Sequence, residues 1–232
     1  MKIDEMLPDR DEQLFVAGQK GTGKSTLIRK MLERLPASEL VIVFDTKGEW
    51  KCRRQWQRWR AEKVPHVRLP HTNVRLLRPA TYIFRPHFPE RADPRCTAIL
   101  MRCLKRGKCT IVIDEASDFS TATSILPALG KVIRQGRWKK VRLLIGSQRP
   151  SGISGLCMTE ATKVACLRLR NDRDRDRMAK EVDPAMRDMP KGRHDFWWQD
   201  DRDTSRDGAI LITQQVDDAA RARVAQGIEK VG

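Results

Sequence analysis

Residues 18–25 have the types and the spacing of a loop that binds a polyphosphate. They read Gly18-Gln19-Lys20-Gly21-Thr22-Gly23-Lys24-Ser25 and directly follow the apolar run 13–17. Glycines let the chain curl so that backbone N–H groups point at phosphate oxygens, and a helix that begins near Lys24 directs its positive end at the same place. We expect Lys24 to reach the β- and γ-phosphates of ATP and the Ser25 hydroxyl to hold Mg²⁺. The predicted nucleotide-binding residues are Gly18, Gln19, Lys20, Gly21, Thr22, Gly23, Lys24, Ser25 and Thr26.

A second apolar segment, 109–113, ends in two adjacent carboxylates, Asp114 and Glu115. Asp114 would lie at the carboxyl end of a strand beside the phosphate loop and hold Mg²⁺ together with Ser25. The neighbouring Glu115 could polarise a water for attack on the γ-phosphate. The pair therefore predicts ATP hydrolysis rather than nucleotide binding alone.

The strand expected at 141–147 is followed by Gln148, Arg149 and Pro150. If this strand lies between the two that carry the phosphate loop and Asp114, Gln148 would lie near the γ-phosphate. It could then orient water or sense whether the terminal phosphate is present. The alternative is an ordinary turn from strand to loop that ends at Pro150.

Two arginines, Arg134 and Arg137, lie at the end of the helix expected before this strand. Both are too far along the chain to serve their own phosphate loop easily. An arginine at such a corner can complete the site of a neighbouring subunit and stabilise transition-state charge there, which requires a head-to-tail ring. Direct contact of these arginines with DNA is the competing interpretation.

The elements that must position these residues alternate between strand and helix. Apolar runs predict strands at 13–17, 40–44, 82–85, 109–114, 141–147 and 163–169, and helices are expected at 24–35, 50–63, 94–106, 121–135 and 171–183. Segments 194–199 and 209–213 suggest a β-hairpin, and a short helix would close the chain. The alternation predicts a single α/β domain over residues 1–232, a three-layer sandwich with a mainly parallel sheet, to which 194–214 adds a small hairpin.

The composition indicates a polyanionic partner. The formal net charge is +16 over 232 residues. Between Lys47 and Lys108 there are seventeen lysines and arginines against four acids, interleaved with Trp50, Trp56 and Trp59. This mixture suits backbone phosphates and exposed bases of nucleic acid. Because the chain has no run of about 18 apolar residues, we expect no direct insertion into a membrane.

Taken together, the motifs resemble those of the FtsK–HerA superfamily of DNA-pumping ATPases. The resemblance covers residues 12–175 and rests on GQKGTGKS, VFDTKGEW, IVIDEAS, RQGRWKKVRLLIGSQRPSGI and CLRLRNDRDRDRM, in the family's order. The family's D-x-K/H-G-E motif is matched by 45–49, and its arginine about ten residues before Q-R-P by Arg137.

This resemblance implies a RecA-like (ASCE) core in which the strand at 141–147 separates the two nucleotide-binding strands. It also implies a homo-oligomeric ring, a hexamer, with double-stranded DNA in the channel. Arg137 would be the trans arginine, with Arg134 as the fallback, and Arg168 or Arg170 would approach a neighbouring nucleotide.

The chain departs from larger superfamily members, since it carries no membrane anchor, DNA-orienting domain, helical insertion or N-terminal barrel. Its size and motif set are similar to those of the genome-packaging ATPases of tailless icosahedral viruses with an internal membrane. We therefore expect a motor that packages double-stranded DNA into a preformed capsid. It would act in the host cytoplasm or at a virion vertex, beside capsid vertex proteins.

Other functions remain open at this point. A cellular or plasmid DNA pump or helicase of the same superfamily, or part of a larger pump, would carry the same motifs. So would an extrusion ATPase of the filamentous-phage type, although those normally have a membrane helix. A small-molecule P-loop kinase could use the arginines of 168–177 to clamp phosphates, but Glu115, Gln148 and the excess positive charge argue against it.

Overall fold

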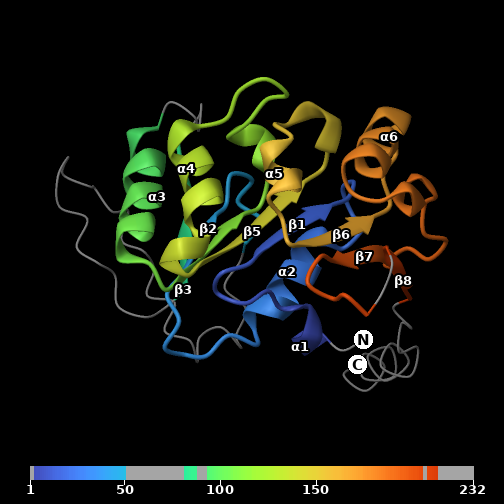
Figure 1. The fold of residues 1–232 in the computed structure, drawn as a ribbon. Helices are drawn as coiled ribbons and strands as arrows, with labels where there is room; N and C mark the ends of the chain where they lie inside the picture. The colour runs from blue at the N-terminus through green and yellow to red at the C-terminus, as the bar shows by residue number, and fades with distance from the viewer. Residues whose placement is uncertain (1–2, 51–80, 88–92, 206–207, 214–232) are drawn as a thin grey trace, which may run out of the picture.

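The computed structural model of the protein describes residues 3–50, 81–87, 93–205 and 208–213. Within these residues eight strands form one sheet, in the order β3-β2-β4-β5-β1-β6-β7-β8 (Figure 1). The strands are β1 (Gln13–Ala17), β2 (Val41–Phe44), β3 (Thr81–Phe84), β4 (Cys109–Ile113), β5 (Val141–Ser147), β6 (Lys163–Leu167), β7 (Phe196–Asp200) and β8 (Ile210–Ile212). The α-helices are α1 (Ile3–Met6), α2 (Lys24–Leu32), α3 (Pro94–Arg106), α4 (Pro127–Gln135), α5 (Leu156–Thr159) and α6 (Asp172–Glu181).

The strands from β3 to β6 are all parallel, and β5 pairs with β1 on one side and with β4 on the other. This order confirms that the strand at 141–147 separates the two strands that carry the predicted nucleotide-binding motifs. β7 pairs antiparallel with β6, and β8 pairs antiparallel with β7. The predicted C-terminal hairpin is therefore present, and it continues the main sheet. These features confirm the predicted α/β class with a mainly parallel sheet.

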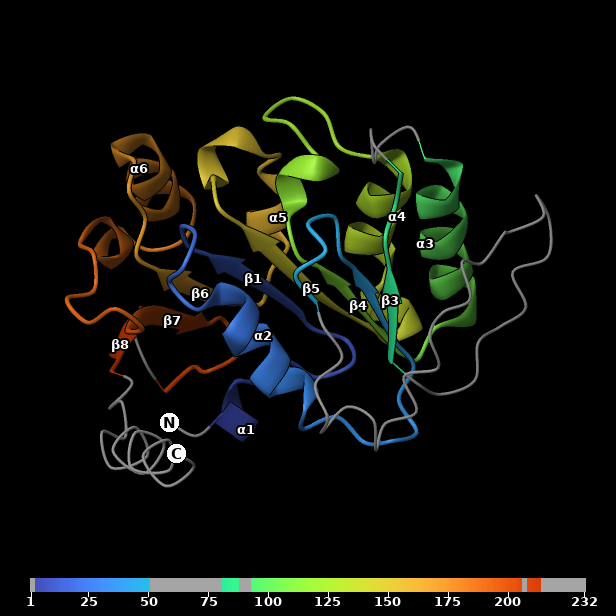
Figure 2. The same cartoon turned by 180° about the vertical axis from the view of Figure 1, so that it is seen from behind.

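Helices cover both faces of the sheet and give three layers. In Figure 1, α3, α4, α5 and α6 lie on the near face, and Figure 2 shows α2 and α1 on the other. Alternate residues of β1 enter two separate cores, with Phe15 packed on the side of α3 to α6 and Val16 on the side of α2. Because both faces are covered, β1, β4 and β5 are buried along their whole length and are mostly apolar, which is why their positions could be predicted from apolar runs.

The helix α3 has the predicted bounds because its start carries a strong capping signal. Asp93 is the N-cap residue and accepts from the backbone N–H of Arg95 at 2.9 Å, and Pro94 takes the first helical position. Burial disfavours the charge of Asp93. Even so, hydrogen bonds from Arg95 and from the backbone N–H of His87 lower its pKa to about 2.

The prediction of a helix over 121–135 was wrong at its start, because α4 begins at Pro127. Residues 120–126 form a turned segment, in which Ser120 and Ile125 make an antiparallel bridge and the N–H of Leu126 donates to the carbonyl of Phe119. Proline lacks an N–H and is favoured in the first turn of a helix, so it marks this start.

Several predicted features lie outside the described residues. These are the helix at 50–63 beyond its first residue, Trp56 and Trp59, and the short C-terminal helix. Trp50 is described, and it is 2% exposed and packs in the core beside α2. No helix in the described ranges has the length and apolar character needed to cross a membrane.

Candidate active site

The predicted phosphate loop joins the carboxyl end of β1 to the start of α2. Gly21 and Gly23 have positive φ angles, 82° and 102°, in the region that favours glycine. Gly23 is also the N-cap of α2 and supplies no side-chain capping bond. The first N–H groups of α2 are therefore free of a side-chain cap and available to an anion, as at other helix starts that bind phosphate.

The base of the loop is fixed by the two strands that flank β1. The N–H of Gly18 donates to the carbonyl of Ser147 at 3.1 Å, and the N–H of Gln19 donates to the carbonyl of Arg168 at 3.0 Å. These bonds hold the loop against the ends of β5 and β6. Lys24 is 6% exposed, and its side chain runs beside Gly146 of β5.

The segment 190–194, far from the phosphate loop in the sequence, also contacts this loop. Nδ1 of His194 lies 3.1 Å from the carbonyl oxygen of Thr22. Arg168 donates to the carbonyls of Pro190 and Lys191 at 2.9 and 2.6 Å, so this segment is tied to the end of β6 as well. Sequence reasoning did not identify His194 as a neighbour of the loop, because the two are 172 positions apart.

The predicted metal-binding pair is assembled. The Ser25 hydroxyl donates to Oδ1 of Asp114 at 3.0 Å, and Asp114 is 2% exposed. A hydroxyl and a carboxylate that converge from a helix start and a strand end are hard oxygen ligands of the kind that Mg²⁺ prefers. The two residues therefore fit a magnesium ion bound together with a nucleotide.

Glu115 lies beside this pair with both carboxylate oxygens engaged. Its Oε2 is 2.7 Å from Nζ of Lys47, and its Oε1 accepts from the backbone N–H of Gln148 at 3.1 Å. The structure thus brings the backbone of Gln148, at the end of β5, to Glu115. Lys47 is a functional candidate that sequence reasoning missed, although the D-x-K-G-E spacing of 45–49 could have drawn attention to it.

A cavity of about 1080 Å³ lies next to the phosphate loop. It is lined by Gln19, Lys20, Gln148, Arg149, Arg168, Leu169, Arg170, Asn171, Asp174 and Arg175. Most of its charged lining is basic, which suits the phosphates of a nucleotide. Arg168 and Arg170, expected at a neighbouring nucleotide, line this cavity beside the loop of their own chain.

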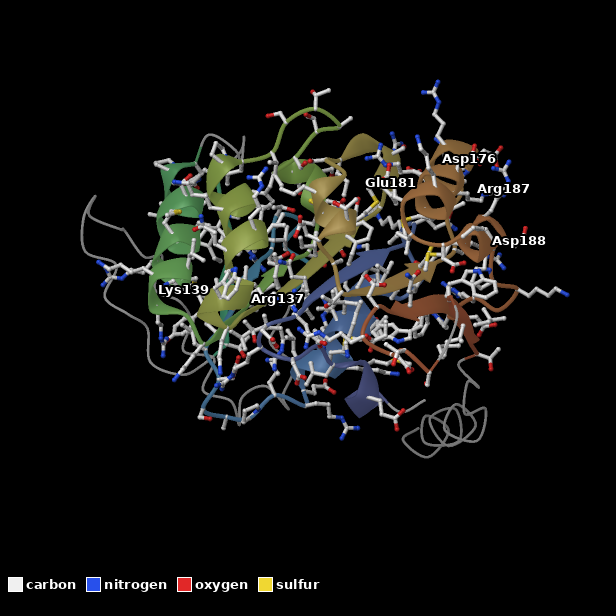
Figure 3. All side chains as sticks on the ribbon, in the orientation of Figure 1. Arg137, Lys139, Asp176, Glu181, Arg187 and Asp188 are labelled. Carbon is white, nitrogen blue, oxygen red and sulfur yellow. The ribbon has the colours of Figure 1, made fainter. Side chains whose placement is uncertain are left out.

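Arg137 lies at the other end of the sheet. It begins the 3-10 turn η4 (Arg137–Lys139), which leads into the start of β5, whereas the phosphate loop follows the end of the adjacent strand. Seven residues of strand correspond to about 20 Å. Figure 3 shows Arg137 and Lys139 at the end of α4, away from α6, the helix whose first turn lines the cavity. Arg134 is likewise exposed, near the end of α4.

The neighbour of Arg137 in η4 is the most exposed large apolar side chain of the described residues. Trp138 is 86% exposed, and Arg137, Lys139 and Lys140 around it are also exposed. Its neighbours Arg137 and Lys139 make no ion pair with a described residue, so the indole of Trp138 is exposed to solvent between two positively charged side chains.

Replacing Gly23 by alanine is expected to reduce ATP affinity at least tenfold. A side chain at φ 102° is strained, and its Cβ would lie 3.1 Å from Nδ1 of His194. Gly152→Ala is the control, because Gly152 has no positive φ and its Cβ would meet Arg149 Cβ at 3.8 Å. Titration with a fluorescent ATP analogue measures both variants, and an unchanged affinity in Gly23→Ala would contradict the loop geometry.

The chain is similar in sequence to a curated viral protein. No protein-family model matches the chain. Among curated proteins, the DNA packaging ATPase P9 of Enterobacteria phage PRD1 is 26% identical over 170 residues, which cover 73% of this chain and 69% of P9.

Solved structures of viral packaging enzymes share the fold. The genome packaging NTPase B204 of Sulfolobus turreted icosahedral virus 2, in complex with ATPγS, superposes with a TM-score of 0.67 at 15% identity. The match covers 90% of this chain and 100% of B204. B204 of Sulfolobus turreted icosahedral virus gives a TM-score of 0.64 at 16% identity and covers 89% and 98% of the two chains.

The sequence similarity to P9 and the fold shared with B204 confirm the resemblance that the motifs predicted. The chain is a P-loop ATPase with a RecA-like fold, similar in sequence to the viral DNA packaging ATPase P9 and in fold to the viral packaging NTPase B204.

Proposed function

We propose that this protein hydrolyses ATP to translocate double-stranded DNA, and that its role is to package a viral genome into a preformed capsid. The observation that carries the proposal is the convergence of Ser25, Asp114 and Glu115 beside the phosphate loop. The similarity to P9, which is named a DNA packaging ATPase, directs this chemistry to packaging.

In the proposed reaction the N–H groups at the start of α2 and the ammonium of Lys24 bind the phosphates. Ser25 and Asp114 hold Mg²⁺, which neutralises phosphate charge when it is bound. Glu115 accepts a proton from the attacking water, and the Gln148 side chain, in the wall of the cavity, orients that water or senses the terminal phosphate. Each of these residues belongs to one chain.

Arg137 would add an arginine to the nucleotide site of the neighbouring subunit in a head-to-tail ring, for which a hexamer is the proposed size. Its exposure and its distance from the phosphate loop of its own chain support a role in trans. The ring would surround the DNA and act in the host cytoplasm, where it would meet capsid vertex proteins.

Duplex DNA is expected to stimulate ATP hydrolysis and to bind without sequence preference. Contacts to backbone phosphates release counterions, so affinity should fall by about 10³-fold or more between 50 and 200 mM salt for six or more contacts. The experiment measures phosphate release with and without duplex DNA, together with the mass of the assembly and DNA binding across a salt series. Salt-insensitive binding, or hydrolysis that duplex DNA leaves unchanged, would contradict a translocase.

The same assay separates a kinase from a translocase. A small-molecule P-loop kinase would transfer the γ-phosphoryl group to a nucleoside or another acceptor, and DNA would not affect its rate. We expect inorganic phosphate as the product and no phosphorylated acceptor, because Glu115, next to Asp114, is proposed to act as a base for water.

A further inference from the structure

Glu115 is held by donors from two different loops of the sheet edge. Lys47, just after β2, reaches Oε2 at 2.7 Å, and the backbone N–H of Gln148, just after β5, reaches Oε1 at 3.1 Å. The Glu115 side chain is 3% exposed, whereas that of Lys47 is 31% exposed. A nearly buried carboxylate is thus fixed at both oxygens, and its counter-charge comes from a residue with access to solvent.

The turn that carries Lys47 is built on a buried carboxylate. Asp45 is fully buried and accepts from the N–H groups of Glu49 and Trp50 at 3.0 and 3.2 Å and from Nε of Arg85 at 3.2 Å. Gly48 has a φ of 68°, which lets the chain reverse within this short span. Asp45 therefore organises the turn without contacting Glu115.

Other side chains tie the same turn to the elements around the site. The Thr46 hydroxyl donates to Asp118, in the 3-10 turn η3 (Ala116–Asp118) that follows Glu115. On the other side, Arg29 of α2 donates to the carbonyl of Glu49 at 2.9 Å and lies 4.8 Å from the ring centre of Trp50. The turn is thus anchored to the helix of the phosphate loop and to the segment after Glu115, and Lys47 is its contact with Glu115 itself.

We propose that Lys47 is a positioning residue that fixes the Glu115 carboxylate in the orientation from which it acts on water. The inference rests on the proposed ATPase function and adds a residue to its machinery. A carboxylate has about four lone-pair sites, so two donors leave capacity for a water. Without Lys47 a nearly buried negative charge would lose its partner, and the carboxylate would turn toward other donors.

An inhibitory role of Lys47 would change the rate of hydrolysis in the other direction when Lys47 is removed. If Lys47 held Glu115 away from the water, removing it would free the base and raise the rate of hydrolysis. A positioning role instead predicts a lower kcat with little change in nucleotide affinity, because Lys47 contacts Glu115 and not the phosphate loop.

The test compares Lys47→Met and Lys47→Arg with Lys30→Met in the full-length protein. Lys30 is exposed on α2 and is a matched change of charge away from the site. We expect Lys47→Met to lower kcat about 100-fold, the effect of misplacing a reacting group by about 1 Å, with KM and the affinity for a fluorescent ATP analogue within twofold of wild type. Lys47→Arg should recover part of the rate because it keeps a cation that can donate to Oε2, and Lys30→Met should match wild type.

A double-mutant cycle with Glu115→Gln identifies the partner. If Lys47 acts through Glu115, adding Lys47→Met to Glu115→Gln should lower kcat no further, since residues that act as a unit are not additive. Losses that multiply in the double variant would overturn the proposal. So would wild-type or higher kcat in Lys47→Met, or a loss of nucleotide affinity equal to its loss of kcat.

Two further outcomes have a defined meaning. If Lys47→Met does not fold, as judged by its circular dichroism, Lys47→Gln, which also removes the cation, decides: a kcat lowered severalfold at unchanged ATP affinity supports the proposal, whereas wild-type kcat overturns it. If the wild-type protein hydrolyses no ATP under any of the conditions above, it is the proposed function that fails, and Lys47 has no reaction to assist.

Discussion

Glu115→Gln is expected to reduce ATP hydrolysis by about 10²- to 10⁴-fold while ATP binding is retained. The amide keeps the shape of the side chain and can still accept from the N–H of Gln148, but it cannot take a proton from water. Phosphate release measures the first effect, and titration with a fluorescent ATP analogue measures the second. Turnover close to that of wild type would remove Glu115 from its assigned role.

Lys24→Ala is the companion variant and should lose hydrolysis for a different reason. Lys24 is 6% exposed and lies at the start of α2, where its ammonium contacts the phosphates in the proposed mode. Its loss should weaken ATP binding as well as hydrolysis. The two variants therefore separate binding from chemistry, and near-normal hydrolysis in Lys24→Ala would contradict the assignment of the phosphate loop.

Arg137→Ala is expected to lower hydrolysis by about 10³- to 10⁵-fold, the range for an arginine that stabilises the transition state from a neighbour. ATP should still bind, because Arg137 lies at the end of the sheet away from the phosphate loop of its own chain. Arg134→Ala, changed three residues earlier near the end of α4, is the comparison. If Arg137→Ala has wild-type activity, the role passes to Arg134 or to no residue of this corner.

Mixing two inactive variants tests the role in trans directly. A subunit with Arg137→Ala keeps an intact phosphate loop, and a subunit with Lys24→Ala keeps Arg137. Where the two are neighbours in the right order, a complete site forms, so mixed rings should recover part of the activity. Recovery would not occur if Arg137 served its own chain or only contacted DNA.

The contact between Arg137 and a neighbouring subunit should also change the fluorescence of Trp138. This side chain is 86% exposed beside Arg137, so docking of the corner on a neighbour would bury it. The emission should shift to shorter wavelength on assembly, and the shift should be absent in Trp138→Phe.

The sequence predicted the inner strands and α3 well because local signals determine them. Strands covered on both faces are continuously apolar, and Asp93 with Pro94 marks the start of α3. The start of α4 was predicted six residues too early because the bridge between Ser120 and Ile125 and its hydrogen bonds leave no simple periodic signal.

At the site, the residues on the phosphate loop and at strand ends could be predicted because their spacing carries the chemistry. The contacts of Lys47 with Glu115 and of His194 with Thr22 could not be predicted, because they depend on which strands are neighbours in the sheet and on where a distant segment of the chain packs. Lys47 meets Glu115 because β2 pairs with β4 in parallel. That pairing follows from tertiary structure and not from any local pattern around Lys47.

The contact between 190–194 and the phosphate loop has a consequence for how the protein is made. The loop precedes β5, β6 and residue 194 in the chain, yet β1 pairs with β5 and β6, and His194 reaches Thr22. A nascent chain that has not yet released residue 194 from the ribosome cannot complete these supports. The ability to bind nucleotide should therefore be acquired only after residue 194 has left the ribosome, so that a nascent chain shorter than this should not compete with folded subunits for ATP.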